Sequence, residues 1–225
     1  MILDTIPFEP DMAALEQGLR LRGNGQRDQV RRLVAEARAI ARPKAVYRAV
    51  SVESKGDDCL VIDGVRFDSR VLRVHLGEAA HIFPHVITCG KELDAWANGI
   101  EDMLQRYWAD AVVTQGLRAA GRALNQHLAE RYQPGQTSYI SPGVFPDFPI
   151  QQQGPLFRLL GDPRAAIGVQ LLKSFLMEPF RTNSGFVFST DEDFVICELC
   201  GTETCSGRLL PFDKGLFDRK YRLDG

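Results

Sequence analysis

The sequence has no apolar run near the roughly 20 residues that a membrane-spanning helix requires. Its N-terminus lacks the basic segment and the long apolar stretch of a signal peptide. Basic residues are not in surplus either, because 27 Lys and Arg stand against 29 Asp and Glu and give a formal net charge of -2. That balance argues against nucleic acid as a partner. We therefore expect a cytoplasmic protein with neither a membrane nor a nucleic-acid partner.

Familiar catalytic motifs are also missing. The chain contains no G-x-S-x-G, no phosphate-binding glycine loop and no H-E-x-x-H. Its four histidines show no metal-ligand spacing, and the glycines at Gly23 and Gly25 lack the preceding strand of a dinucleotide fingerprint. No residue is therefore predicted to be catalytic, and whether the protein is an enzyme stays open.

The composition is that of a folded protein, with 44% apolar and 25% charged residues in 225. Helical patterns dominate up to about residue 135, whereas strand patterns dominate beyond Gly161. This segregation predicts a single α+β domain with a twisted, mostly antiparallel sheet flanked by helices. Within that domain we expect a helical part at about 1–135 and a loop- and strand-rich part with the cysteines at about 136–212.

Hydrophobic periodicity and capping residues predict the individual elements. Helices are expected at 12–19, 30–40, 69–76, 91–132 and 156–160. Strands are expected at 45–52, 59–62, 65–67, 82–89, 166–171, 185–189 and 193–196. Arg22–Gly25 is expected to break the first helix, Asp68 to cap the third, and Leu176–Pro179 to form a turn. Asp63-Gly64 is expected to form a type I′ turn that joins the strands at 59–62 and 65–67 into a hairpin. The tail 213–225 is expected to fold over the surface or be loosely held.

One long segment has no regular pattern, the loop Ser141–Pro149 with its three prolines. Loops of this length expose many backbone groups and often bind ligands, and proline lowers the entropy cost of holding such a loop open. A second segment ends in Ser184-Gly185 before a strand, where glycine permits close approach of a ligand. A rigid structural connection is the alternative interpretation of the loop.

Three of the five cysteines, Cys197, Cys200 and Cys205, fall within nine residues. Thiolates gathered by a tight turn bind soft metals or carry out redox chemistry, and zinc or an iron–sulfur cluster needs a fourth ligand. Cys89, at a strand-to-helix junction, is our first candidate for that ligand. Cys59 comes second, because it alternates into a hairpin like a small core residue. Arg208 is a candidate to stabilise a thiolate or a bound anion. Free or redox-active thiols, and cysteines packed as small apolar residues, are the alternatives.

The loop motifs occur in an order that resembles a known family. They are Ser141-Pro142-Gly143, Pro146, Pro149, Leu159-Leu160-Gly161, Ile167-Gly168, Ser174-Phe175-Leu176-Met177, Pro179 and Ser184-Gly185, preceded by Val86 to Leu93 and a long helical pattern. The family is the reactivation domain of cobalamin-dependent methionine synthase, which binds S-adenosylmethionine. The chain looks most like the stand-alone, activation domain-like form, and the resemblance covers roughly residues 63–208.

The resemblance implies a crevice for S-adenosylmethionine. The residues that would form it are Tyr139, Ser141, Pro142, Gly143 and Phe145, with Ser184 and Gly185 opposite and Arg208 for the ligand's carboxylate. Tyr139 stands about where the family carries an arginine. Val144 stands where the family carries an aromatic residue, which Phe145 could replace.

The resemblance also implies a function. It is that of an accessory protein assisting reductive methylation of a corrinoid, with the cobalamin carried by a separate methionine synthase or methyltransferase. The cysteine triplet is absent from the reactivation domain of the long enzyme. This addition suggests a version that supplies its own electron relay, in which the cysteines hold an iron–sulfur cluster or zinc. One alternative is a metal-containing or iron–sulfur electron-transfer protein that serves a corrinoid partner without binding S-adenosylmethionine. Another is a zinc-stabilised interaction module.

Overall fold

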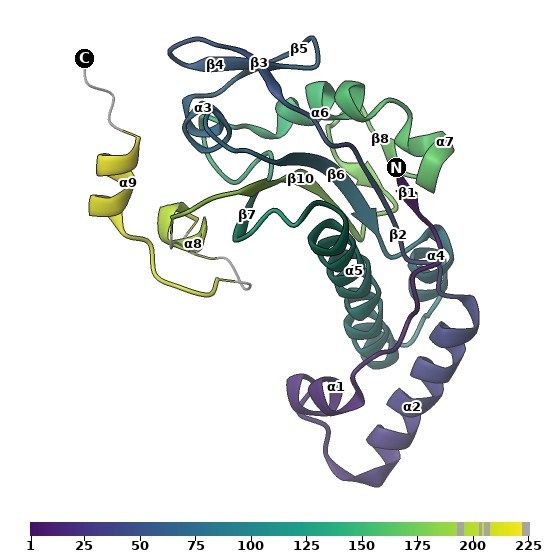
Figure 1. The fold of residues 1–225 in the computed structure, drawn as a ribbon. Helices are drawn as coiled ribbons and strands as arrows, with labels where there is room; N and C mark the ends of the chain where they lie inside the picture. The colour runs from purple at the N-terminus through teal and green to yellow at the C-terminus, as the bar shows by residue number, and fades with distance from the viewer. Residues whose placement is uncertain (193–195, 203, 205–207, 222–225) are drawn as a thin grey trace. The chain divides into compact units, whose positions relative to one another are not determined.

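The computed structural model describes residues 1–192, 196–202, 204 and 208–221. Its strands form three sheets, shown in Figure 1. The five-stranded sheet has the order β1 (Ile2–Leu3), β2 (Lys44–Tyr47), β6 (Ile82–Thr88), β10 (Thr182–Ser189), β7 (Thr137–Ile140). The three-stranded sheet has the order β3 (Val52–Lys55), β4 (Cys59–Ile62), β5 (Val65–Asp68), and β8 (Gln170–Leu171) pairs with β9 (Met177–Glu178). The pairs β1–β2, β7–β10, β3–β4, β4–β5 and β8–β9 are antiparallel, as predicted.

The described helices range from four residues to a single helix of 30. They are α1 (Met12–Gly18), α2 (Gly23–Ile40), α3 (Arg70–Leu76), α4 (Lys91–Asn98), α5 (Met103–Tyr132), α6 (Gln153–Leu160), α7 (Pro163–Ile167), α8 (Ile196–Leu199) and α9 (Lys214–Lys220), with a 3-10 turn η1 (Ile150–Gln152). In the described part of the chain, none of these helices is long and apolar enough to cross a bilayer. The predicted α+β class, with antiparallel sheets flanked by helices, is confirmed.

The chain divides into two compact units whose segments alternate along the sequence. Unit 1 comprises Met1–Val46, Val86–Glu130 and Asp162–Asn183. Unit 2 comprises Tyr47–His85, Arg131–Gly161 and Ser184–Gly225. The expected division of one domain near residue 135 stays a prediction.

Unit 1 is built around the long helix α5, beside which α1 and α2 lie (Figure 1). The buried face of α2 carries the apolar residues that periodicity predicted, including Val30, Val34 and Ala37. A Cβ added at Gly116 of α5 would lie 2.9 Å from Leu93 Cδ1 and 3.3 Å from the Cβ of Cys89. These neighbours are side-chain atoms, and they show that α5 packs closely against the start of α4 at this glycine.

Unit 2 contains the hairpin that the sequence indicated most clearly. Asp63 and Gly64 both have positive φ angles, 44° and 73°, as a two-residue type I′ turn requires. The turn sets Ile62 opposite Val65, and Asp63 also accepts a hydrogen bond from Arg48 at 2.7 Å. The following helix α3 is capped by Ser69 rather than by Asp68, because the Ser69 hydroxyl accepts from the Leu72 N–H at 3.0 Å.

Several predicted elements were wrong, and local capping explains the clearest case. The strand predicted at 166–171 is mostly the helix α7, and only Gln170 and Leu171 are extended. Asp162 caps this helix through the Ala165 N–H at 3.0 Å, Pro163 occupies its first turn, and Gly168 ends it at φ 78°. Capping residues of this kind stabilise short helices. The strand was predicted from the apolar residues at 166–171 alone, without the capping residues that precede them.

The helix predicted at 91–132 is divided into α4, which ends before Gly99, and α5. Other differences lie at element ends. Gly23 begins α2 instead of lying in a break, and the turn predicted at 176–179 contains the strand β9. Ile196 begins the helix α8, whereas the rest of the strand predicted at 193–196 lies outside the described residues. In the tail, Lys214–Lys220 form the helix α9, whose cap is the Asp213 carboxylate accepting from the Leu216 N–H at 2.8 Å, and residues 222–225 lie outside the described residues.

Candidate functional site

The Ser141–Pro149 loop is a closed turn whose backbone bonds to itself. The Gly143 N–H donates to the Phe148 carbonyl at 2.7 Å, and the Phe148 N–H donates to the Phe145 carbonyl at 3.0 Å. Gly143 has a φ of 90°, which side-chain-bearing residues rarely adopt. The loop predicted from its prolines is thus confirmed as irregular, and these bonds fix its shape.

Asp147 anchors this loop to α3, a role that the sequence did not reveal. Its carboxylate accepts from the Ser69 hydroxyl at 2.9 Å and from the Val71 N–H at 2.7 Å. A carboxylate at the first turn of a helix satisfies N–H groups that have no partner within the helix. In the sequence, Asp147 is an acidic residue between two prolines, and that pattern does not show which helix the carboxylate caps.

Gly185 and the start of the loop are in direct contact. A Cβ added at Gly185 would lie 2.3 Å from the Ile140 carbonyl oxygen and 2.9 Å from Ser141 Oγ. The contact follows from the antiparallel pairing of β7 with β10, which sets Phe186 opposite Ile140. The structure therefore brings Gly185 and Ser141 together. The neighbouring Ser184 is buried, and its hydroxyl donates to Gln153 Oε1 at 2.8 Å.

The other residues expected at the crevice differ in exposure. Tyr139, on the end strand β7 of its sheet, is half-exposed, whereas Pro142 and Phe145 are buried. Phe145 packs edge-on against Tyr221, with ring centroids 5.9 Å apart. Just beyond the loop, Gln152 Oε1 is buried and has no hydrogen-bond partner among the residues that the structure describes. Buried acceptors in native proteins normally have a hydrogen-bond partner, so this oxygen is a candidate to bond a ligand.

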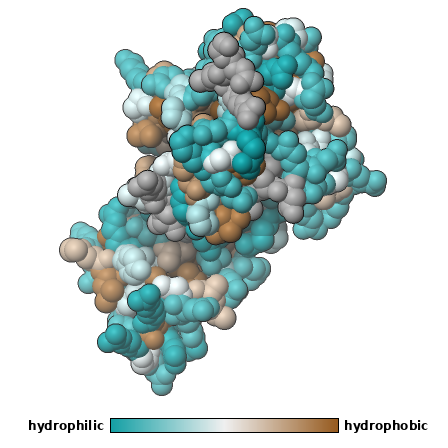
Figure 2. All heavy atoms as spheres, turned by 90° about the vertical axis from the view of Figure 1, so that its left-hand side faces the viewer, coloured by the Kyte–Doolittle hydropathy of each residue, from teal (hydrophilic) through white to brown (hydrophobic). Residues whose placement is uncertain are grey.

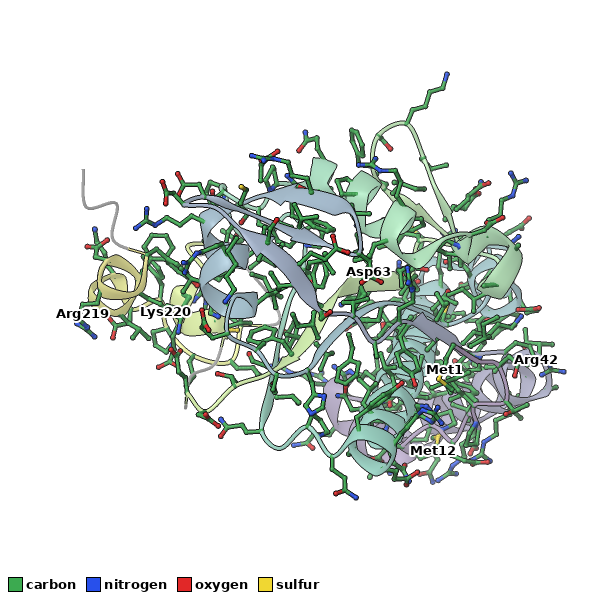
Figure 3. The ribbon with its side chains drawn as sticks, turned by 45° about the horizontal axis from the view of Figure 1, so that its top comes forward. Met1, Met12, Arg42, Asp63, Arg219 and Lys220 are labelled. Carbon is green, nitrogen blue, oxygen red and sulfur yellow. The ribbon has the colours of Figure 1, made fainter. Side chains whose placement is uncertain are left out.

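The buried side chains of His75 on α3 and Tyr221, the residue after α9, are in contact. His75 Nε2 and the Tyr221 hydroxyl are 2.5 Å apart, and both side chains are buried. Burial, with a smaller effect of Lys220, lowers the pKa of His75 to about 3. Burial, with a smaller contribution from Asp147, raises the pKa of Tyr221. Lys220 of α9 bonds Glu192, and Figure 3 shows the side chains of Lys220 and Arg219 on different sides of α9.

We expect this neutral histidine to make the protein acid-sensitive. In the unfolded chain an imidazole titrates near pH 6.5, so below that pH the unfolded state binds a proton that the folded state does not. The His75 contribution is complete above pH 6.5 and is lost as the pH falls toward about 3. The contribution of His75 alone to the free energy of unfolding should fall by about 1.4 kcal/mol per pH unit between these values.

The measurement is urea unfolding at pH 7, 6, 5 and 4.5 on the wild type and on His75→Gln. His85, whose pKa burial lowers to about 4, contributes a similar slope that both proteins share. The variant should show about half the slope of the wild type. Equal slopes in the two proteins would contradict a neutral, buried His75.

Arg208 organises the segment that carries Cys197 and Cys200. Its guanidinium donates to four backbone carbonyls, those of Cys200 at 2.8 Å, Thr202 at 2.7 Å, Cys197 at 3.0 Å and Leu210 at 3.0 Å. This side chain closes the segment around the cysteines. The surface beyond it is partly apolar: Leu209 is 76% exposed, and Figure 2, which faces α8 and α9, shows hydrophobic residues among hydrophilic ones.

Cys197 and Cys200 lie on one turn, with free thiols that are partly exposed. The Cys200 N–H donates to the Cys197 carbonyl at 3.3 Å, and the Leu209 N–H lies 3.5 Å from Cys197 Sγ. Cys200 Sγ lies 3.8 Å from the Val144 carbonyl, so the turn contacts the Ser141–Pro149 loop. Cys205 lies outside the described residues. Among the described residues no group of three or more His, Cys, Asp or Glu could hold a metal ion.

Cys89 has a different environment from the other cysteines named here. It is fully buried in the core of unit 1, among residues such as Phe8, Leu93 and Trp108, and its thiol lies 3.4 Å from the Gly90 carbonyl. Burial, followed by the charge of Asp94, raises the pKa of the Cys89 thiol to about 12. This placement favours the alternative of a neutral, packed thiol, because metals bind thiolates.

Comparison with known proteins identifies the fold. No protein-family model matches the chain, and neither does any curated protein. Among solved structures the chain is similar to the MetH reactivation domain bound to AdoHcy. The sequences are 17% identical, the TM-score is 0.57, and the match covers 86% of this chain and 80% of that one. The chain therefore has the fold of the MetH reactivation domain, as its loop motifs predicted.

Proposed function

We propose that this protein assists the reductive methylation of a corrinoid carried by a separate methionine synthase or methyltransferase, and that it binds S-adenosylmethionine to do so. The observation that carries the proposal is the likeness of fold to the MetH reactivation domain, which in its solved structure is bound to AdoHcy. AdoHcy is what S-adenosylmethionine becomes when it gives up its methyl group, so a fold that holds one suits the other.

The chemistry belongs to the bound groups, and the protein contributes binding and orientation. S-adenosylmethionine supplies the methyl group, whose bond to sulfur breaks as a bond to cobalt forms, after an external donor has supplied one electron to the corrinoid of the partner. The crevice residues have to hold the sulfonium and direct its methyl group outward. Exclusion of water around the methyl group would favour transfer to the partner.

Two features of the loop region fit such a ligand. Tyr139 presents a half-exposed ring, and an aromatic face attracts a cation such as a sulfonium. The unpartnered Gln152 Oε1 is an acceptor that suits the amino groups of the ligand. Ser141, Gly143 and Gly185 hold the backbone around the crevice in this proposal. The side chains of Pro142, Phe145 and Ser184 pack beneath the crevice and support it. Arg208 contributes indirectly in this proposal, by holding the segment that carries Cys197 and Cys200.

The binding test compares the charged and the neutral ligand. We expect calorimetric titration of the protein with S-adenosylmethionine and with AdoHcy to give saturable, one-to-one binding. Tyr139→Leu should weaken S-adenosylmethionine about tenfold, because a cation–aromatic contact contributes about 1–2 kcal/mol. AdoHcy, which has no positive sulfur, should be much less affected. Phe180→Leu is the control, since Phe180 is 67% exposed and lies outside the loop. Equal losses for both ligands would contradict the proposed place of Tyr139.

The cysteine turn supports a second candidate, an iron–sulfur or other metal-containing electron-transfer protein for a corrinoid partner. The turn returns Cys197 and Cys200 to one region, and an N–H group already points at Cys197 Sγ. In this proposal Cys205 would complete a set of three ligands. Cys89 is poorly suited as the fourth ligand, because burial raises the pKa of its thiol and metals bind the thiolate. In the first proposal such a centre would serve as an electron relay.

Metal and sulfide analysis of protein prepared without oxygen separates these cases. Iron with sulfide, together with no binding of S-adenosylmethionine, would select the electron-transfer function. Tightly bound zinc that is unchanged by reduction would select the interaction module. Cys200→Ser should lower the metal content at least twofold, whereas Cys59→Ser, on the β4 hairpin strand, should leave it unchanged. No metal in the wild type would leave the cysteines as free thiols.

A further inference from the structure

A cavity of about 420 Å³ lies between α1 and α5, entirely within unit 1. Its size is in the range of small-molecule pockets. The α1 wall is apolar, with the buried Leu15 and the half-buried Leu19. The α5 wall carries Tyr107, Thr114 and Arg118, whose spacing of seven and four residues places them on one face of the helix. The groove thus has one apolar and one polar side, as ligand sites commonly do.

Gln115 is the residue that points to a ligand. Its side chain lines the cavity and only 7% of the residue is exposed. Its amide has no hydrogen bond to any residue in the described part of the chain. The Gln115 amide nitrogen and oxygen are not among the fully buried unpartnered atoms of the described residues, so the amide reaches the water of the cavity, which a ligand would displace. A ligand that displaces this water has to offer a hydrogen-bonding edge in its place.

The charges around the cavity favour an anion. The Asp110 carboxylate is already matched by Arg181 at 2.9 Å, and the Thr114 hydroxyl donates to the Asp110 carbonyl at 2.8 Å. Arg118 is exposed, and no described residue forms an ion pair or a hydrogen bond with its side chain. Of the two charged residues that line the cavity, Asp110 is paired and Arg118 is not, so a ligand that neutralises Arg118 would be an anion.

We propose that this groove binds a small heteroaromatic carboxylate. Gln115 and Arg118 are three residues apart, so their Cα atoms differ by about 4.5 Å along the helix. A ligand must then carry its hydrogen-bonding atom and its negative group a few ångströms apart, as a six-membered ring does. The carboxylate pairs with Arg118, the ring nitrogen accepts from the Gln115 amide, and the ring face packs on Leu15 and Leu19.

Three probes separate these contacts: nicotinate, benzoate, which lacks the ring nitrogen, and nicotinamide, which lacks the charge. Titrations of the full chain are followed by the amide resonances of α1 and α5. We expect nicotinate to bind at least fivefold more tightly than either of the others. Gln115→Met, which keeps the volume and removes the amide, should reduce nicotinate to the level of benzoate and leave benzoate unchanged. Arg118→Gln should reduce nicotinate to the level of nicotinamide.

A matched pair of glycine variants tests the location. Gly18 lines the cavity, and a Cβ added there meets nothing within 4 Å, so Gly18→Phe would extend into the groove. Gly25 of α2 also has open space around it, and Gly25→Phe is the control. Gly18→Phe should lower nicotinate affinity at least tenfold and Gly25→Phe should not. The proposal is overturned if nicotinate shifts no groove resonance at about 10 mM, if the three probes bind equally, or if both phenylalanine variants behave alike.

Discussion

Gly185→Ala is expected to destabilise the protein more than any other single-methyl change in the loop region. The added Cβ would lie 2.3 Å from the Ile140 carbonyl oxygen, well inside contact distance. That oxygen belongs to the backbone of β7, which is paired with β10 and cannot turn aside as a side chain would. Overpacking of this kind costs about 3 kcal/mol, which corresponds to a fall of roughly 6–12 °C in melting temperature for a chain of this size.

The measurement is thermal unfolding followed by circular dichroism, with Gly121→Ala as the control. A Cβ at Gly121 of α5 meets Ile87 Cδ1 at 3.5 Å, an ordinary contact, and alanine favours a helix. The control should therefore melt at or slightly above the wild-type temperature. If Gly185→Ala melted like the wild type, the contact between Gly185 and the start of the loop would be incorrect.

Arg208→Lys is expected to open the cysteine segment while keeping its charge. The guanidinium of Arg208 donates to four carbonyls at once, which the single ammonium of lysine cannot do. Loss of these bonds should lower the stability of the segment by about 1–3 kcal/mol. Cys197 and Cys200 should then react roughly tenfold faster with a thiol reagent, because the segment opens more often.

Mass spectrometry of the labelled protein gives the rate for each cysteine. Cys59, which is far along the chain in the β4 hairpin strand, is the internal reference and should keep its wild-type rate. Arg32→Lys is the matched control, since Arg32 is exposed on α2 and its side chain bonds to none of the described residues. Unchanged rates at Cys197 and Cys200 in Arg208→Lys would contradict the role assigned to Arg208.

The parts of the fold that local signals determine could be predicted. The Asp63-Gly64 turn and the buried face of α2 depend on residues within a few positions of each other. The proline-rich loop was recognisable for the same reason. The order of the loop motifs along the chain also predicted the fold, and the similarity to the solved MetH reactivation domain confirms it.

The rest depends on contacts between residues distant in sequence or on competing local effects. Asp147 bonds Ser69 across 78 positions, and Tyr221 meets His75 across 146, so neither partner was visible from spacing alone. The helix α7 was missed because its apolar residues also suit a strand, and the cap at Asp162 decides between the two. Gln115 is one of many polar residues along α5, and only the cavity beside it distinguishes it from the others.

Transfer of a labelled methyl group from S-adenosylmethionine to a cobalamin-bearing fragment of a methionine synthase tests the central claim most directly. The fragment, in its cob(II)alamin form, is incubated with a chemical one-electron reductant, with or without this protein. We predict label on the corrinoid, and AdoHcy in equal amount, only when the protein is present. Label that appears at the same rate without it, or binding of neither S-adenosylmethionine nor the fragment, would contradict the proposed function.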